Sequence, residues 1–110
     1  MDWNNKETKE LIRAILALET ADQAKRFLRD LMTEGEITEF SKRLKAAEML
    51  AGGFSYSSIE KETGFSSTTV ARVSKWLNNG MGGYKAILSK LHHNNPTKLG
   101  KGLSFSGSPK

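Results

Sequence analysis

Residues 56–77, with the sequence YSSIEKETGFSSTTVARVSKWL, decide the fold of this chain. A helix-turn-helix consists of a short helix, a tight turn and a second helix that crosses the first at a wide angle. Gly64 stands where the turn belongs, since glycine accepts a positive φ at little cost. Ser66 or Ser67 is suited to cap the second helix, because a serine hydroxyl accepts a hydrogen bond from a free amide there. The segment therefore predicts a helix-turn-helix and binding to double-stranded DNA.

Two faces are distinguishable along the second helix of this segment. Val70 and Val73 are spaced so that they turn back toward Ile59 of the first helix. Hydroxyl and basic side chains take the other face, where they can bond phosphates or base edges, and Arg72 can also read guanine with two hydrogen bonds. The residues that we expect to contact DNA are Tyr56, Ser57, Ser66, Ser67, Thr68, Thr69, Arg72 and Lys75.

Helical periodicity begins close to the N-terminus. Apolar side chains recur at helix spacing between residues 11 and 18, and Asn4 or Asn5 can cap the helix that they predict. Thr20 is suited to cap a second helix, which we expect to end near Thr33.

The third predicted helix begins with Thr33-Glu34-Gly35-Glu36, which has the pattern of a capping box. A narrow apolar seam follows, in alternating steps of three and four residues: Ile37, Phe40, Leu44, Ala47 and Ala51. Such a seam suits a core face, a coiled-coil face or both. Gly52 and Gly53 are expected to end the helix.

The C-terminal part changes in character after residue 91. A last helix is predicted over residues 84–91, beyond a glycine-rich turn. Residues 92–110 are rich in Gly, Ser, Asn and Pro and hold little apolar surface, so we expect a disordered basic tail. The sequence thus predicts an all-α fold of about six helices, with one helical domain over residues 1–91 and a tail over residues 92–110.

Charge is distributed unevenly along the 110 residues, whose net charge is +5. Residues 1–40 carry nine acidic and six basic side chains, whereas residues 41–80 have a balance of +3 and residues 81–110 a balance of +5. Cations gathered in the C-terminal two-thirds suit a polyanion, so the charge pattern also favours nucleic acid as the partner.

Several classes of function are disfavoured. The chain has no cysteine, and its two histidines lie together at positions 92 and 93, so no catalytic constellation is apparent and we expect neither an enzyme nor a cofactor. Adjacent histidines are poorly spaced for one metal ion, and no metal site is expected. The polar N-terminus and the lack of a long apolar run predict a cytoplasmic protein without membrane contact.

The segment from Leu31 to about Tyr84 resembles the Trp repressor superfamily, in particular its Trp-repressor-like bacterial branch. The resemblance is carried by LMTEGEITEFSKRLKAAEMLAGG and by YSSIEKETGFSSTTVARVSKWLNNGMGGY, about half of the chain. It implies an all-helical fold, an intertwined homodimer and operator binding through a pair of recognition helices.

The same resemblance implies an effector pocket formed by Arg43, Arg72, Val73 and Trp76. In Trp repressor the indole of the ligand lies between two arginines. Arg72 matches the second, and Arg43 matches the first, with Lys42 as a competing assignment. Val73 stands in place of a glycine and Trp76 in place of a serine that helps to hold the ligand. Two bulky side chains there argue against free tryptophan as the effector, and Trp76 could itself fill the space of the indole.

Two functions follow as hypotheses. The first is a homodimeric, sequence-specific transcriptional regulator, acting as a repressor through its helix-turn-helix. The second is a protein-interaction module that keeps the fold without reading DNA. Glu60 and Glu62 beside the turn would repel phosphates and give the second hypothesis some support.

Overall fold

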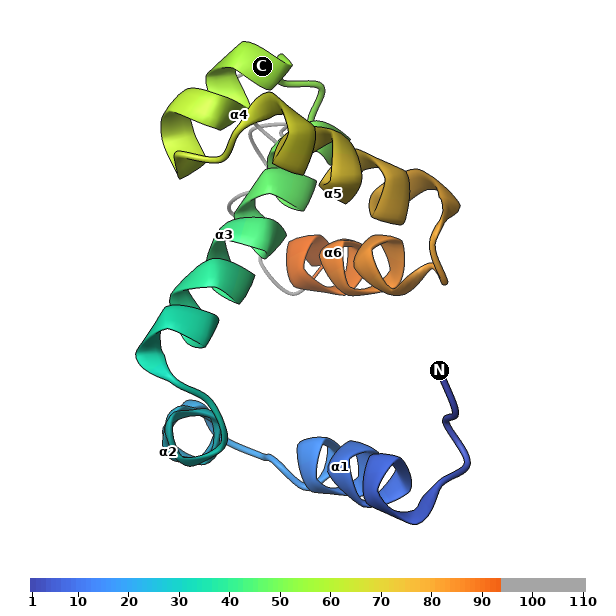
Figure 1. Cartoon of the computed structure of the whole chain (residues 1–110). Helices are drawn as coiled ribbons and strands as arrows, with labels where there is room; N and C mark the ends of the chain where they lie inside the picture. The colour runs from blue at the N-terminus through green and yellow to red at the C-terminus, as the bar shows by residue number, and fades with distance from the viewer. Residues whose placement is uncertain (94–110) are drawn as a thin grey trace. The chain divides into compact units, whose positions relative to one another are not determined.

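The computed structural model describes residues 1–93, and the secondary structure of this part consists of six α-helices (Figure 1). The helices are α1 (Lys6–Leu16), α2 (Ala21–Leu31), α3 (Glu34–Ala51), α4 (Tyr56–Thr63), α5 (Ser67–Asn79) and α6 (Gly83–His93). The predicted all-α class and number of helices are confirmed. The last helix runs two residues past the predicted start of the tail, and residues 94–110 of that tail lie outside the described residues.

The chain divides into two compact units, residues 1–37 and residues 38–110, and the division falls within α3. Polar caps define the helices of the first unit. Asn5 caps α1 by accepting a hydrogen bond from the amide of Thr8 at 2.8 Å, and Thr20 caps α2 by accepting one from the amide of Gln23 at 3.1 Å. The predicted starts of α1 and α2 are therefore confirmed, and Asn5 is the one of the two candidate residues that caps α1.

Neither α1 nor α2 buries a single residue within the chain. Both helices are nonetheless amphipathic, and large apolar side chains stay substantially exposed on them: Leu11, Ile12, Ile15, Leu16 and Leu31. Exposed apolar side chains of this kind are unusual on a helix without a packing partner, because the burial of apolar area is the main source of helix stability in water.

The start and the end of α3 follow their sequence signals. The Glu36 amide donates to Thr33 Oγ1 at 3.0 Å, and the Glu36 carboxylate accepts from the Thr33 amide at 2.9 Å, so the predicted capping box is present. At the other end the amide of Phe54 donates to the carbonyl of Met49, and that of Gly53 to the carbonyl of Leu50. Gly53 has φ 85°, so this Schellman-type end requires a residue that tolerates the left-handed region.

The second unit holds the core. Buried side chains from α3, α4, α5 and α6 form one cluster: Ala46, Ala47, Met49, Ile59, Val70, Val73, Leu77 and Leu88. In this unit α5 packs against both α4 and α6 (Figure 1). The core therefore fixes the two helices of the predicted helix-turn-helix.

Most of the predicted apolar seam on α3 stays at the surface of the single chain. Ala47 is fully buried, but Phe40 is 44% exposed, Leu44 is 39% exposed and Ala51 is also exposed. The intramolecular core instead takes Ala46 and Met49 beside Ala47. Among the five residues of the predicted seam, Ala47 is thus the one that belongs to the core of the chain itself.

Within residues 1–93 no helix is both long enough and apolar enough to span a lipid bilayer.

Candidate nucleic-acid interface

The turn between α4 and α5 has the geometry that the sequence predicts. Ser55 caps α4, its hydroxyl accepting from the amide of Ser58 at 3.1 Å. Gly64 ends α4 with φ 78°, and its amide donates to the carbonyl of Glu60 at 2.8 Å. A β-carbon at Gly64 would meet no atom within 4 Å, so the glycine is needed here for its backbone conformation and not for space.

Thr63 stabilises the turn with a buried hydroxyl. Its Oγ1 donates to the carbonyl of Ile59 at 2.7 Å and accepts from the amide of Phe65 at 3.1 Å. Both hydrogen bonds lie where the chain leaves α4, and the Thr63 side chain is almost fully buried. A polar residue in this position is therefore stable because both functions of its hydroxyl are satisfied.

The N-terminus of α5 is held by two of the predicted DNA-binding residues. Ser66 is the N-cap, and its hydroxyl accepts from the amide of Thr69 at 3.2 Å and donates to the hydroxyl of Thr69 at 3.1 Å. Thr69 is half-buried, whereas Ser67 and Thr68 are exposed. Ser66 and Thr69 thus use their hydroxyls within the cap, and Ser67 and Thr68 present theirs to solvent.

The two faces of α5 are clearly separated. Val70 and Val73 are fully buried and Leu77 nearly so, whereas Arg72 and Lys75 are exposed. Neither Arg72 nor Lys75 forms an ion pair in the part of the chain that the structure describes. Their positive charges are consequently available to an external anion, on a surface that also carries the hydroxyls at the start of the helix.

Helix α4 contributes the remaining predicted contacts. Tyr56 and Ser57 are both exposed in its first turn. Glu62 is exposed as well, and Glu60 is half-buried. The acidic side chains thus lie toward the end of α4, while its first turn is free of acidic residues.

The four residues of the expected effector pocket have different environments. Val73 belongs to the closed core, and Arg72 lies on the exposed face of α5. Trp76 is 41% exposed, and the guanidinium carbon of Arg43 lies 5.3 Å from the centroid of its ring. Arg43 and Trp76 are therefore directly paired, whereas Val73 is fully buried in the core.

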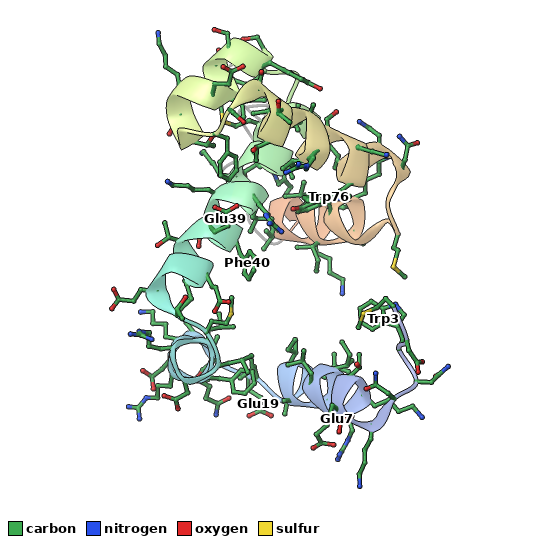
Figure 2. The ribbon with its side chains drawn as sticks, viewed as in Figure 1. Trp3, Glu7, Glu19, Glu39, Phe40 and Trp76 are labelled. Carbon is green, nitrogen blue, oxygen red and sulfur yellow. The ribbon has the colours of Figure 1, made fainter. Side chains whose placement is uncertain are left out.

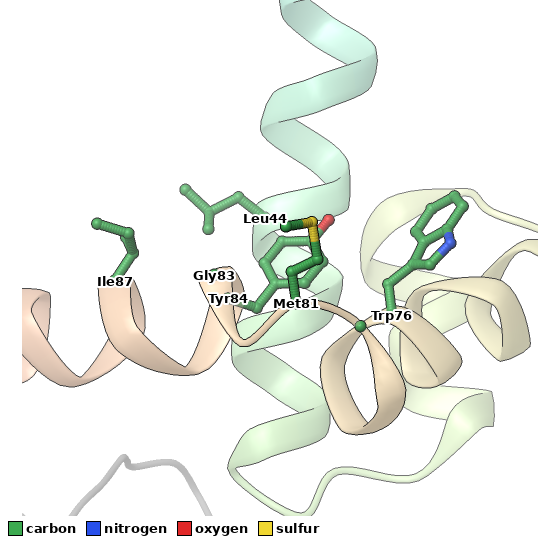
Figure 3. Close-up of a pocket in the computed structure, with 7 residues that line it drawn as sticks. Leu44, Trp76, Met81, Gly83, Tyr84 and Ile87 are labelled. Carbon is green, nitrogen blue, oxygen red and sulfur yellow. The ribbon is translucent and has the colours of Figure 1, made fainter. Parts of the chain in front are cut away.

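Trp76 also lines an open, almost entirely apolar groove of about 570 Å³ (Figure 3). The other residues that line it come from α3, from α6 and from the turn between α5 and α6: Leu44, Gly80, Met81, Gly83, Tyr84 and Ile87. Burial raises the pKa of the Tyr84 phenol above its ordinary value of 10.0, and the positive charge of Arg43 opposes part of that rise.

Sequence reasoning missed two partners of Arg43, the residues Phe40 and Glu39. Its guanidinium carbon lies 5.1 Å from the centroid of the Phe40 ring, and its Nε is 3.6 Å from Glu39 Oε2. The one-turn spacing of Phe40 and Arg43 was a usable local signal for the first contact. The contact with Trp76, on another helix, had no local signal, and only the family resemblance placed Trp76 and Arg43 in one pocket.

The sequence profile of the Trp repressor protein family matches residues 6–92, and the chain belongs to this family. YerC of Bacillus subtilis, an uncharacterised protein, is 40% identical over 86 residues, which cover 78% of this chain and 83% of YerC.

Two solved structures are similar to about four fifths of the chain. A TrpR-like protein from Eubacterium eligens has a TM-score of 0.78 and 35% identity, covering 81% of this chain and 92% of that one. A candidate Trp repressor from Staphylococcus aureus has a TM-score of 0.76 and 38% identity, covering 80% and 88% of the two chains. Proteins of the Trp-repressor-like family are regulatory DNA-binding proteins, so the expectation that this chain is not an enzyme is confirmed by its family.

Proposed function

We propose that the protein is a sequence-specific DNA-binding transcriptional regulator, a repressor that acts as a homodimer through α4 and α5. The observation that carries the proposal is the exposed face of α5. There Arg72 and Lys75 form no ion pair with any of residues 1–93, while the opposite face is buried in the core through Val70 and Val73. A rigid helix that offers cations and hydroxyls is what the major groove requires of a recognition helix.

Dimerisation is supported by the first unit. With no buried residue of their own, α1 and α2 retain exposed apolar side chains that a second copy would cover. A two-fold symmetric dimer would bind a pseudo-palindrome whose half-sites are separated by one helical turn of DNA, about 34–36 Å. We place this activity in the cytoplasm, where the bacterial chromosome lies.

Free tryptophan is not the proposed effector. Val73 is sealed in the core, and the indole of Trp76 already stacks on Arg43. A calorimetric titration of the protein with tryptophan should therefore give no binding heat, and saturable binding would refute this part of the proposal.

The test is the selection of bound sequences from a random duplex library, followed by mobility-shift titrations at several salt concentrations. We expect an enriched pseudo-palindrome and an affinity that falls as salt rises, because phosphate contacts release counterions. Enrichment of no sequence, with no binding to any duplex at low salt, would favour the interaction module instead.

A further inference from the structure

One side chain outside the core connects three helices of the second unit. The guanidinium of Arg43, on α3, lies against the rings of Phe40 and Trp76, at 5.1 Å and 5.3 Å from their centroids. Glu39 lies beside the same group, with 3.6 Å between Arg43 Nε and Glu39 Oε2, and Figure 2 marks Glu39, Phe40 and Trp76. On α6, burial raises the pKa of Tyr84, and the charge of Arg43 makes that rise smaller.

The surroundings of Arg43 make this contact stronger than an ordinary surface pair. Its side chain is only 36% exposed, so the guanidinium has lost much of its water. A cation over an aromatic ring is attracted more strongly as it is desolvated, and the planar guanidinium stacks better than a lysine ammonium. The ring of Trp76 is thereby held from the side of α3.

The position of Trp76 gives this contact a consequence for α5. Trp76 lies one residue beyond Lys75 and one turn beyond Arg72, and it is followed by Leu77, which is buried in the core. Trp76 itself is 41% exposed, so burial alone does not immobilise its side chain.

We propose that Arg43 is a positioning residue for DNA binding. By holding the ring of Trp76, Arg43 adds to the packing of Leu77 in fixing the C-terminal half of α5, and hence the angle at which Arg72 and Lys75 meet the duplex. The proposal rests on the proposed function, because it assigns the orientation of the DNA-binding helix. Arg43 does not itself contact phosphate, since two rings and a carboxylate already surround its guanidinium.

The experiment uses the full chain with Trp3→Phe, which leaves Trp76 as the single tryptophan. Arg43→Gln removes the cation, and Arg43→Lys keeps the charge without the planar group. Lys45→Gln is the matched control, because it removes the same charge from α3 at a side chain that approaches Glu48 and no ring. Each variant is measured by acrylamide quenching of Trp76 fluorescence and by affinity for the selected duplex across a salt series.

We expect Arg43→Gln to expose Trp76 to acrylamide and to weaken DNA binding by about threefold to thirtyfold, the range that corresponds to one cation–π contact. The slope of log affinity against log salt should stay unchanged, because no phosphate contact is lost. Arg43→Lys should give acrylamide quenching and DNA affinity between those of the parent protein and of Arg43→Gln. If Arg43→Gln does not fold, Arg43→Lys takes its place as the test variant. Lys45→Gln should leave the quenching unchanged.

Unchanged quenching and unchanged affinity in Arg43→Gln would overturn the proposal. A salt slope smaller by about one, with unchanged quenching, would also overturn it, because Arg43 would then be a phosphate ligand. If the parent protein binds no duplex, the proposed function fails and the role of Arg43 with it. If the parent binds and Arg43→Gln binds equally well, the proposal for Arg43 fails alone.

Discussion

Arg72 and Lys75 lie one turn apart on α5, both exposed and both outside any ion pair of residues 1–93, yet their chemistry differs. The planar guanidinium of Arg72 can form two parallel hydrogen bonds to the edge of guanine, whereas the ammonium of Lys75 is a mobile point charge. Under the proposed function, Arg72 therefore reads sequence and Lys75 contributes charge.

Arg72→Ala should cost about 1–3 kcal/mol in binding to the selected duplex and relax the preference at one base pair. Lys75→Ala should instead weaken binding to all duplexes about equally and reduce the salt slope by about one. Both effects are measured by mobility-shift titration against the selected duplex and single-base variants of it. Equal losses on every duplex for Arg72→Ala would show that it contacts phosphate only.

The turn between α4 and α5 is the element that sets the angle between them. Gly64 has φ 78° with free space around its α-carbon, so only the backbone conformation excludes other residues. We expect Gly64→Ala to lower the free energy of unfolding by about 1–2 kcal/mol, the cost of left-handed backbone for an L-residue.

Gly35→Ala is the matched control for Gly64→Ala. Gly35 lies in the first turn of α3 with ordinary helical backbone, and a β-carbon there would meet only Thr33 Oγ1, at 3.9 Å. This change should therefore leave stability unchanged or raise it by up to about 1 kcal/mol. Urea unfolding followed by circular dichroism measures both, and equal effects of the two substitutions would contradict the role given to Gly64.

Tyr84, in the first turn of α6, reports on the junction between α3 and α6. Burial raises the pKa of its phenol, and the positive charge of Arg43 makes that rise smaller. In a Tyr56→Phe background, Arg43→Gln should therefore raise the pKa of Tyr84 further, as measured by ultraviolet absorbance of the phenolate during an alkaline titration. A pKa that stays constant or falls would show that the charge of Arg43 does not reach the phenol.

The same pKa shift has a defined sign for stability. The contribution from Tyr84 is fully present below the phenol pKa of the unfolded chain, near 10. It is lost as the pH rises from there through the raised pKa of the folded state, because the unfolded chain ionises first.

Elements were predictable from sequence where their determinants are local. Thr20, the Thr33–Glu36 capping box and Gly64 each act on backbone within a few residues, and each has the predicted geometry. The pairing of Arg43 with Trp76 had no local signal, since it joins α3 to α5, and only the family resemblance placed the two residues in one pocket. The role of Thr69 was only partly predicted, because its hydroxyl is taken up by the cap at Ser66.

At the scale of the whole molecule, the exposed apolar side chains of α1 lead to a prediction about the oligomeric state. Ile15 is 46% exposed in a helix that buries nothing within the chain. If the protein is the proposed homodimer, we expect Ile15→Asn to shift it from dimer to monomer and to weaken binding to the selected duplex in parallel, because two half-sites are bound only by a dimer.

Lys9→Asn, an exposed polar substitution in the same helix, should leave the dimer intact. Sedimentation velocity over a range of concentrations measures the assembly of both variants. A monomeric parent protein, or an Ile15→Asn variant that still dimerises at the parental concentration, would contradict the assembly proposed for α1 and α2.

The lack of any buried residue in α1 and α2 also bears on how the protein is made and removed. These helices are synthesised before the second unit, and the isolated segment has no interior around which to condense. If the proposed homodimer forms, the helices remain open to proteolysis until a second copy covers them, since cleavage follows the population of poorly protected states. We then expect an unpartnered subunit to be degraded faster than an assembled one, so that little of the protein persists in its unassembled form.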